Sequence, residues 1–334
     1  MKPHRTLLWL VLLFACVGVS LGAVVGVGGL HPSPYVDDWS DVDLRGTGVD
    51  ASAAIQACLA ASGHAILGEG VYTVDPNASV AVTMAAGNLI EGAGMGLTTL
   101  QLPDNETGAA VLLDDDCTLR NLTIDAFDDA STLGARALSS KHRSTYDHVE
   151  FRDLSTGCQD GAAAVNGVAL LACKVTSCVT GVNIANASTG VQIVDGIFNG
   201  NTTTSLSLSG GPVSGRIVGN LFIDEATAIS MGSASQFAIS GNTVLAASAG
   251  TISLGTAINC DFGQNNLNVN WPSFVTGTRN TVQGRYFGNA APASGAWQTG
   301  DIVWDISPTS ADPSYYQCSA GGSPGTWKDG PDVP

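Results

Sequence analysis

Positively charged residues are scarce in this 334-residue chain. Lys and Arg number 13 against 29 Asp and Glu, only four of the 13 are lysines, and the formal net charge is −16. Proteins that bind nucleic acid need basic clusters to meet the phosphates, so this composition excludes nucleic acid as the expected partner. The acidity suits a calcium-rich or saline exterior, and equally a soluble surface with no special role.

Clusters of cysteine and histidine at metal-ligand spacing are also missing. There is no Cys-x-x-Cys and no Cys/His group at zinc spacing. The cysteines that follow residue 30 are Cys58, Cys117, Cys158, Cys173, Cys178, Cys260 and Cys318. Their number is odd, so at least one thiol is unpaired. One or two disulfides are compatible with an exported protein, and their pairing stays open.

Charge is absent from Thr6 to Leu30, directly after the basic residues of the extreme N-terminus. Leu7 to Val19 is typical of the apolar core of an export signal, and Ser20-Leu21-Gly22 is an acceptable cleavage site. Two alternatives remain. The uncharged segment 6–30 is long enough to stay as a membrane anchor, and Leu13-Phe14-Ala15-Cys16 is similar to a lipoprotein-processing box. Each version predicts a secreted or cell-surface protein.

Helical periodicity is absent too, and a longer repeat takes its place. Large apolar residues recur at spacings of 27, 24, 23, 24, 22 and 23 residues: Ile124, Phe151, Val175, Phe198, Phe222, Val244 and Leu267. A second apolar residue stands five places before each of them. Units too short to bury their own apolar face indicate a stack of similar coils. Because the units read as short β segments between Gly and Asn turns, we predict an all-β solenoid.

One inward position of the repeat holds Asn220, Asn242 and Asn265 in successive units. A buried amide without a partner costs about 1–3 kcal/mol. These asparagines are therefore expected to hydrogen-bond to one another along the stack. The alternative is that they are turn asparagines, and both versions support the same solenoid.

The segment before the repeat contains a helix signal followed by two strands. Asp50 and Ser52 are N-cap candidates for a helix over Ala51–Ala61, which would cover the open end of the first coil. Residues 65–74, AILGEGVYTV, then predict two strands joined by a turn.

The run LRGTGVDASAAIQACLAASGHAILGEGVYTV (44–74) resembles the N-terminal signature of the pectate-lyase-like superfamily of right-handed parallel β-helices. GAGMGLTTLQL (92–102) resembles the next coil of the same proteins. This sequence has Arg45-Gly46-Thr47-Gly48 where an acidic residue commonly sits between the glycines. The resemblance implies a right-handed parallel β-helix with an N-terminal capping helix. It leaves the chemistry open, because the superfamily includes lyases, glycoside hydrolases, epimerases, phage tailspikes and adhesins.

The end of the chain differs from the repeat in composition. The coil pattern stops after Gln283, and NAAPASG (289–295) has the composition of a linker. We predict a β-helix over 31–284 and a small aromatic-rich β module over 285–334. Trp297, Trp304 and Trp327 of this module are candidates for stacking on sugar rings, or else form the core of a small domain.

The residues directly before and directly after the large apolar residue of each unit (Ile124, Phe151 and their equivalents) are expected to point outward. They carry charge only in the first three units. The register places Asp125 beside Arg152, and Glu150 beside Lys174, about 4.8 Å apart along the axis. The segment 131–143 interrupts the rhythm and is expected to be an excursion loop that walls a groove. Further acids and bases near this face are Asp128, Asp129, Asp153, Lys141, His142 and Arg143.

Two reactions can use such a face. Cleavage of a uronic-acid polymer by β-elimination needs a cation against the sugar carboxylate and a base for the C5 proton. Asp125, Asp128 and Asp129 are candidate calcium ligands, and Arg152 or Lys174 is the candidate base. Glycoside hydrolysis needs two carboxylates about 5 Å apart for retention or about 6.5–9.5 Å for inversion. Candidates for that pair are Asp125, Glu150 and Asp153. Alternatively, these groups are surface ion pairs of little energetic worth.

Three other features have both a functional and a structural interpretation. Asp114-Asp115-Asp116 is a calcium loop or, without the ligand spacing of known calcium motifs, a solvated turn. His142 and His148 are candidate general bases, but no partner for His148 is evident from the sequence.

These features predict an exported protein that binds and cleaves an extracellular, acidic polysaccharide, with Ca²⁺ as a candidate cofactor. The alternative is a non-catalytic adhesin or spike in which the solenoid is a rigid stalk. Nothing in the sequence indicates an oligomeric state.

Overall fold

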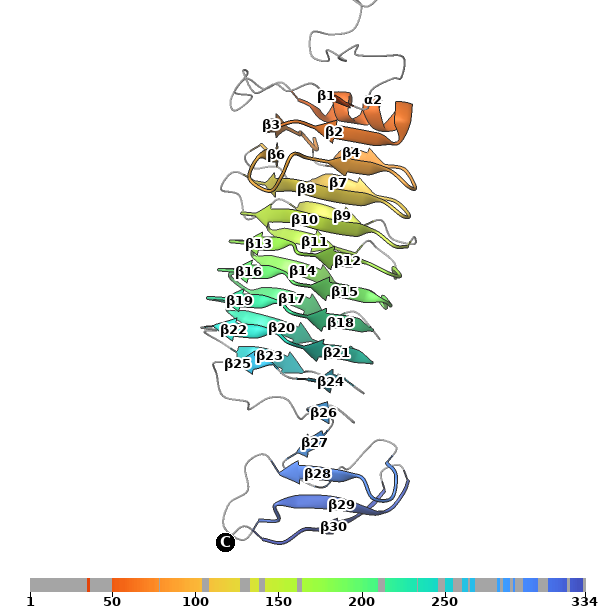
Figure 1. The fold of residues 1–334 in the computed structure, drawn as a ribbon, viewed down its shortest axis with the longest axis vertical. Coiled ribbons are helices and arrows are strands. Elements are labelled where there is room, and N and C mark those ends of the chain that lie inside the picture. Colours follow the sequence, from red (N-terminus) through yellow and green to blue (C-terminus); the bar gives the residue numbers. More distant parts are fainter. Residues whose placement is uncertain are drawn as a thin grey trace, which may run out of the picture.

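The fold is a stack of β coils in a single column (Figure 1). The computed structural model describes residues 35–36, 50–77, 79–103, 108–126, 133–137, 142–160, 164–209, 214–232, 234–245, 250–254, 260–263, 265–267, 281–282, 285–288, 291, 297–305, 312–322 and 325–332. The predicted export signal or anchor over 1–30 lies outside them. No helix in the described part of the chain is long and apolar enough to span a bilayer.

Each coil contributes two short strands to one large sheet and one strand to an opposite sheet of eight strands. The first strand of each coil is one of β2 (His64–Leu67), β5 (Leu89–Glu91), β12 (Ala169–Leu171), β15 (Val191–Val194), β18 (Gly215–Val218), β21 (Phe237–Ser240) and β24 (Asp261–Phe262). The second strand is one of β3 (Gly70–Thr73), β6 (Thr98–Gln101), β13 (Lys174–Thr176), β16 (Ile197–Asn199), β19 (Leu221–Ile223), β22 (Thr243–Leu245) and β25 (Asn266–Leu267). Two longer strands, β8 (Thr118–Asp125) and β10 (Thr145–Arg152), run through both positions. The opposite sheet contains β4 (Val80–Met84), β7 (Ala109–Leu113), β9 (Leu133–Ala137), β11 (Thr156–Gln159), β14 (Thr180–Ile184), β17 (Thr204–Leu208), β20 (Thr227–Met231) and β23 (Gly250–Leu254).

The parallel register confirms the alignment of the repeat. Ile124 pairs with Phe151, Phe151 with Val175, and the column continues through Phe198 and Phe222 to Val244 and Leu267. The rings of Phe198 and Phe222 stack at a centroid distance of 4.8 Å with an interplanar angle of 15°, and both side chains are completely buried. The molecule is therefore the predicted right-handed parallel β-helix, with its core inside the coils.

The predicted asparagine ladder is also confirmed. Oδ1 of Asn242 accepts hydrogen bonds from the backbone N–H of Asn220 (3.0 Å) and from its side-chain amide (2.9 Å). Asn242 donates in the same way to Asn265. Asn220 and Asn242 are 1% exposed, so each amide meets its hydrogen-bonding needs through the next coil.

A helix covers the N-terminal end of the stack, as predicted. Helix α2 (Ser52–Ser62) buries Ile55 and Leu59 against the first coil and ends at Gly63, whose φ of 71° suits glycine. Asp50 Oδ1 accepts the backbone N–H of Ser52 at 2.8 Å. A short strand, β1 (Tyr35–Val36), pairs in parallel with β2.

The excursion loop predicted over 131–143 is partly wrong. Residues Leu133–Ala137 form β9, which pairs in parallel with β7 and β11. The extra length of this unit therefore lies in the segments on either side of a regular strand. Residues 127–132 and 138–141 lie outside the described part of the chain, so the proposed groove wall stays a prediction.

The described cysteines are all free thiols, and all of them except the partly exposed Cys58 are buried as small apolar groups. Cys158, Cys173 and Cys178 lie inside the coils, where burial raises the pKa of each thiol to about 12. Such thiols stay protonated and unreactive.

Glu225 is a deeply buried carboxyl group, 1% exposed. It accepts hydrogen bonds from the backbone N–H of Asn201 (3.1 Å) and from its side-chain amide (3.1 Å). Burial raises the pKa of Glu225 from 4.5 to about 7. Asn201, within the sequon Asn201-Thr202-Thr203, is 1% exposed and so cannot accept a glycan in the folded protein.

Stability is expected to fall as the pH rises from about 4.5 to about 7, because over this range the unfolded chain releases the Glu225 proton and the folded protein keeps it. The folded state holds this proton more tightly than the unfolded chain, so the loss is complete only above the folded pKa. Glu225→Gln should remove this part of the pH dependence, on the order of 2 kcal/mol, in urea unfolding followed at pH 5 and pH 8. Asp224→Asn, at the exposed neighbour, is the matched control. Equal pH slopes for wild type and Glu225→Gln would contradict the assignment.

The C-terminal strands leave the parallel pattern. β26 (Thr281–Val282) still pairs in parallel with β24, and then pairs antiparallel with β27 (Arg285–Gly288). β28 (Ile302–Asp305), β29 (Tyr315–Ala320) and β30 (Thr326–Asp329) form an antiparallel sheet. Its core contains Trp297, Val303, Tyr316 and Cys318. The domain limits 31–284 and 285–334 stay predictions.

Candidate functional site

The acids and bases predicted to be neighbours do lie on adjacent coils. Arg152 of β10 pairs with Asp125 of β8, and Glu150 of β10 pairs with Lys174 of β13. These four residues, here called the ion cluster, occupy outward positions on three successive strands. Their side chains meet because a parallel sheet places equivalent positions of neighbouring strands side by side.

The two carboxylates of the ion cluster are buried, while the two cations reach solvent. Side-chain exposure is 9% for Asp125 and 6% for Glu150, against 37% for Arg152 and 42% for Lys174. The outward positions Thr123 and Gln101 on the preceding strands are also buried. The interpretation of these groups as surface ion pairs is therefore wrong for the carboxylates.

Hydrogen bonds hold Glu150 rigidly. Its Oε1 accepts from Lys174 Nζ at 2.7 Å and from Thr176 Oγ1 at 3.4 Å, and its Oε2 accepts from Thr123 Oγ1 at 3.2 Å. The backbone N–H of Gly96 in turn donates to Thr123 Oγ1 at 2.8 Å. Glu150 therefore fixes the position of the Lys174 ammonium group, and the other N–H donors of that group remain available to a ligand.

Asp125 holds Arg152 through one oxygen and keeps the other unused. Arg152 Nη2 donates to Asp125 Oδ2, and this hydrogen bond raises the pKa of Arg152 above its already high ordinary value. Asp125 Oδ1 is buried without a hydrogen-bond partner among the described residues. Asp153 Oδ2 lies 4.0 Å from Arg152 Nε. A buried carboxylate oxygen without a donor is costly and often marks a functional group.

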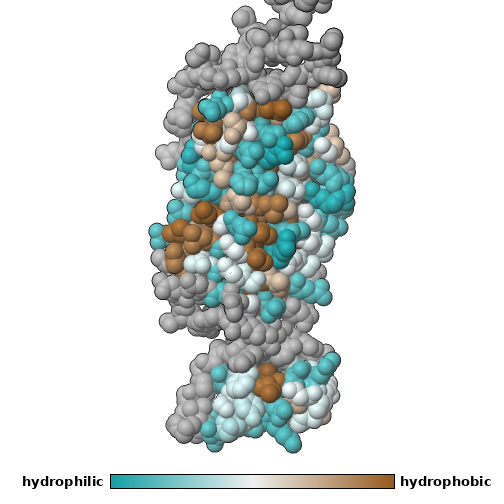
Figure 2. Space-filling model, in the orientation of Figure 1, coloured by the Kyte–Doolittle hydropathy of each residue, from teal (hydrophilic) through white to brown (hydrophobic). Residues whose placement is uncertain are grey.

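Charge ends abruptly along this face after Lys174. The next residue in its column is Ile197, which is 41% exposed, and the neighbouring column of Arg152 leads to Leu245, which is 38% exposed. Figure 2 shows hydrophobic side chains gathered over the middle of the column, with a smaller group near its N-terminal end. This agrees with the prediction that charge is confined to the early coils.

A second row of charged residues lies on the first strand position of the same coils, and of its members only His148 was among the residues predicted from the sequence. Glu91 Oε2 is 2.7 Å from Arg120 Nη2 and 3.7 Å from His64 Nε2. Arg120 pairs in register with Asp147, whose Oδ1 is 2.7 Å from His148 Nδ1. The sequence contains a signal for Glu91, Arg120 and Asp147, because each directly follows the apolar residue that opens its coil in the repeat.

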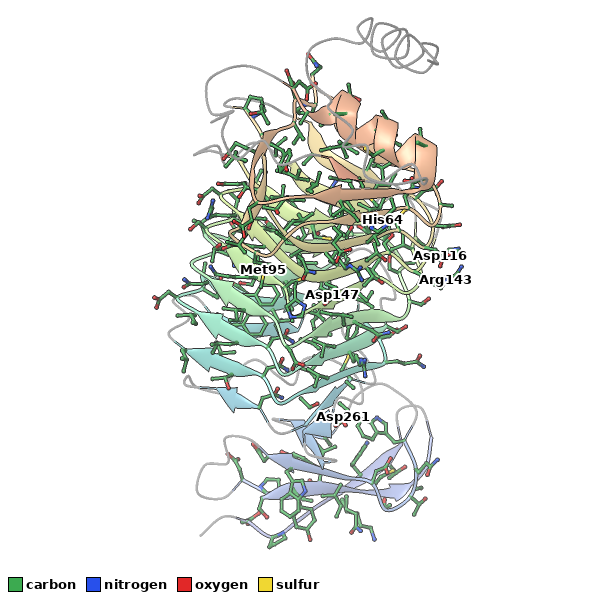
Figure 3. The ribbon with its side chains drawn as sticks, turned by 45° about the horizontal axis from the view of Figure 1, so that its top comes forward. His64, Met95, Asp116, Arg143, Asp147 and Asp261 are labelled. Carbon is green, nitrogen blue, oxygen red and sulfur yellow. The ribbon has the colours of Figure 1, made fainter. Side chains whose placement is uncertain are left out.

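Asp114, Asp115 and Asp116 form a turn and not a calcium loop. Asp114 Oδ1 accepts the backbone N–H of Asp115 at 2.8 Å, and Asp115 Oδ1 accepts the backbone N–H of His142. Asp116 Oδ2 pairs with Arg143 Nη2 at 2.6 Å, and the two lie side by side at one edge of the solenoid (Figure 3). The hydrogen bond from Arg143 lowers the pKa of Asp116.

The predicted calcium ligands are not assembled in the described part of the chain. No group of three or more His, Cys, Asp or Glu residues at metal-binding distance occurs there. Asp128, Asp129 and Lys141 lie outside the described residues, so their roles stay predictions. His142 Nδ1 accepts the backbone N–H of Asn166 at 3.1 Å.

The tryptophans of the C-terminal module divide into two groups. Trp297 is 6% exposed, and its ring meets the ring of Trp327 edge to face with 5.0 Å between the ring centroids. Trp297 therefore packs in the core of the module. Trp304 pairs across strands with Tyr315 at 5.3 Å, and both rings are partly exposed. Of the three tryptophans predicted to bind sugar, Trp297 is buried, while Trp304 and Trp327 are partly exposed.

Residues 136–319, more than half of the chain, match the family model described as periplasmic copper-binding protein (NosD). The chain belongs to the NosD family. The sequence matches no curated protein.

Among solved structures, this NosD-family chain is similar to three β-solenoid proteins. One is the A-module of mannuronan C-5 epimerase AlgE4 from Azotobacter vinelandii, with 16% identity, 72% of this chain and 76% of that chain covered, and a TM-score of 0.38. Another is the surface adhesin PfbA of Streptococcus pneumoniae, with 10% identity, 85% and 96% covered, and a TM-score of 0.41. A third is a mannuronic acid specific polysaccharide family 6 lyase from human gut microbiota, with 12% identity, 77% and 80% covered, and a TM-score of 0.38. Similarities this distant say nothing about the chemistry of this chain.

The description of the NosD family raises the question of whether the described residues fit copper. Copper prefers thiolate, thioether and imidazole ligands. The thiols of Cys158, Cys173 and Cys178 are buried, and burial raises the pKa of each to about 12. His64, His142 and His148 are each near a different partner and do not converge. The described residues of this NosD-family chain therefore do not fit a copper site.

Proposed function

We propose that this chain is an extracytoplasmic protein that binds and cleaves an acidic polysaccharide at the ion cluster. The observation that carries the proposal is the arrangement of Arg152 and Lys174. Both cations lie on the outer face of adjacent coils, half-exposed, and each is held by a carboxylate buried beneath it. The export signal expected over 1–30 and the periplasmic description of the family support the location.

An acidic glycan fits this arrangement better than a neutral one. A sugar carboxylate accepts charge-assisted hydrogen bonds from guanidinium and ammonium groups, and these are about twice as strong as neutral ones. Because Arg152 and Lys174 are already oriented by Asp125 and Glu150, little side-chain entropy is lost when a ligand binds. Arg143, although paired with Asp116, is an exposed cation at the edge of the same coils.

The state of the carboxylates favours β-elimination over glycoside hydrolysis. Hydrolysis requires a carboxyl group that gives or takes a proton at the glycosidic bond. Both Glu150 oxygens accept hydrogen bonds, and Asp125 has one oxygen engaged by Arg152 and the other buried away from solvent. In β-elimination the cluster instead neutralises the sugar carboxylate and so acidifies the C5 proton. Ca²⁺ held by Asp125, Asp128 and Asp129 would supply further positive charge to the same carboxylate.

Weaker binding of acidic oligosaccharides is expected in Lys174→Gln and Arg152→Gln. The glutamine amide still donates to the buried carboxylate, but the charge offered to the ligand is lost. We expect at least a tenfold rise in Kd for oligogalacturonate and oligomannuronate, about 1.4 kcal/mol or more, by calorimetry with and without calcium. The matched controls Lys328→Gln and Arg216→Gln, both outside the cluster, should bind like wild type.

Cleavage is read in the same samples from the absorbance of unsaturated products and from reducing ends. Loss of product in Asp125→Ala but not in Asp224→Ala would support the location of the site. Unchanged Kd in both cluster variants, with loss in a control variant, would contradict it.

The second candidate function is a non-catalytic adhesin whose solenoid is a rigid stalk. It is favoured by the pairing within the ion cluster, since Asp125 is engaged by Arg152 and Glu150 by Lys174. Binding of acidic glycans without any unsaturated or reducing product would select this alternative.

A further inference from the structure

The row of charges beside the ion cluster ends in an aspartate–histidine pair on β10. Nδ1 of His148 lies 2.7 Å from Oδ1 of Asp147, and the His148 side chain is 55% exposed. A carboxylate at Nδ1 fixes the ring proton on that nitrogen. Nε2 of His148 is then left with a lone pair that faces solvent and has no hydrogen-bond partner among the described residues.

His148 stands at the corner between the two rows of charge. Its φ is 53°, and the residues at the same bend in other coils, Asn121, Ala172 and Asp195, also have φ values of 49–57°. The left-handed backbone is therefore a property of the bend, which turns the imidazole outward. The register that pairs Asp147 with Leu171 and Glu150 with Lys174 places Ala172 beside His148 on the next coil. Ala172 has a small side chain and stands two residues before Lys174, so the register brings His148 and Lys174 to neighbouring positions of adjacent coils.

The ion cluster itself provides cations but lacks an available base. The hydrogen bond from Arg152 to Asp125 raises the pKa of Arg152, so its guanidinium is even harder to deprotonate. Lys174 Nζ donates a hydrogen bond to Glu150 Oε1 at 2.7 Å. Asp125 Oδ1 is without a partner but is buried. A reaction at carbon needs a base with an exposed lone pair.

The other described histidines do not provide that base. His142 Nδ1 already accepts a backbone N–H, so in the neutral ring its Nε2 carries the proton. His64 Nε2 is buried and lies 3.7 Å from the carboxylate of Glu91. His148 is the described imidazole that combines a carboxylate on one nitrogen with an exposed second nitrogen.

We infer that His148 is the catalytic base for cleavage of a uronic-acid polysaccharide at the ion cluster, with Asp147 as the residue that positions it. This inference rests on the proposed function. Arg152 and Lys174 bind the carboxylate at C5, and His148 Nε2 takes the C5 proton. The electron pair of the C5–H bond forms the C4–C5 double bond, the C4–O4 bond breaks, and the leaving oxygen takes a proton from water. No oxidant or reductant is required.

The test compares the full-length wild type with His148→Gln and Asp147→Asn on oligogalacturonate and oligomannuronate. His148→Gln should lower kcat for unsaturated product at least about a hundredfold, the usual scale for loss of a general base, while the Kd for the oligosaccharide stays within twofold. Asp147→Asn should lower kcat at least tenfold with KM unchanged, and should alter the acidic limb of the pH–rate profile. His64→Gln, another imidazole on the same sheet, is the control and should retain wild-type kcat.

The outcomes separate this inference from the function on which it rests. Wild-type kcat in His148→Gln would overturn the inference and leave the proposed function standing. Glycan binding without turnover by wild type would overturn the inference and select the adhesin. No binding and no turnover on either substrate would overturn the proposed function itself. Circular dichroism of each variant shows whether a loss reflects misfolding, and His148→Asn provides a second, smaller replacement at the exposed bend.

Discussion

Phe222→Ala is expected to lower the free energy of unfolding by about 3–5 kcal/mol, the usual cost of removing a buried phenylalanine. Phe222 is fully buried, stacks on Phe198, and pairs in register with Val244 on the following coil. Each coil is stabilised mainly by its neighbours, so the cavity should weaken the contacts on both sides. Urea unfolding followed by circular dichroism measures the change.

The control for this substitution is Ile197→Ala, one residue before Phe198 and 41% exposed. An outward side chain removes little apolar area from water, so this change should stay within about 0.5 kcal/mol. Equal losses for the two variants would mean that inward and outward positions had been assigned the wrong way round.

Asn242→Ala is expected to destabilise the protein by about 2–4 kcal/mol, although it removes little apolar surface. Oδ1 of Asn242 is the acceptor for two buried donors of Asn220, its backbone N–H and its side-chain amide. Without that oxygen the backbone N–H of Asn220 loses its partner in a place where water has little access, and the side-chain amide keeps only its hydrogen bonds to the carbonyls of Ile193 and Val218. The loss should therefore exceed that of an ordinary polar-to-alanine change.

Asn199→Ala, at an exposed outward position of β16, is the matched control and should be nearly neutral. Chemical unfolding of both variants, with amide hydrogen exchange at residue 220, separates a ladder from isolated turn asparagines. A neutral Asn242→Ala with unchanged protection at Asn220 would contradict the ladder.

The stacking of coils could be predicted from the sequence because it depends on a periodic pattern. Once Phe151, Phe198 and Phe222 are aligned, the register of every intervening residue follows, and with it the pairs Asp125–Arg152 and Glu150–Lys174. The same periodicity exposed the asparagine ladder. In a solenoid, sequence offsets translate directly into neighbours in space, which is why these contacts were accessible without coordinates.

Burial and side-chain direction could not be predicted in the same way. The pattern assigns Asp125 and Glu150 to the outside of the coil, and their burial there depends on neighbours such as Thr123 and the turn at Gly96. The partner of His148 is its own neighbour in sequence, Asp147, and becomes available because the chain bends there with a left-handed φ. Apolar alternation carries no information about such a bend.

The most direct test of the account is a crystal structure of the protein with an oligogalacturonate or oligomannuronate bound. We predict a sugar carboxylate within hydrogen-bonding distance of Arg152 and Lys174, and a ring whose C5 faces Nε2 of His148. A sugar bound only at Trp304 and Tyr315 of the C-terminal module, with the ion cluster untouched, would contradict the central claim.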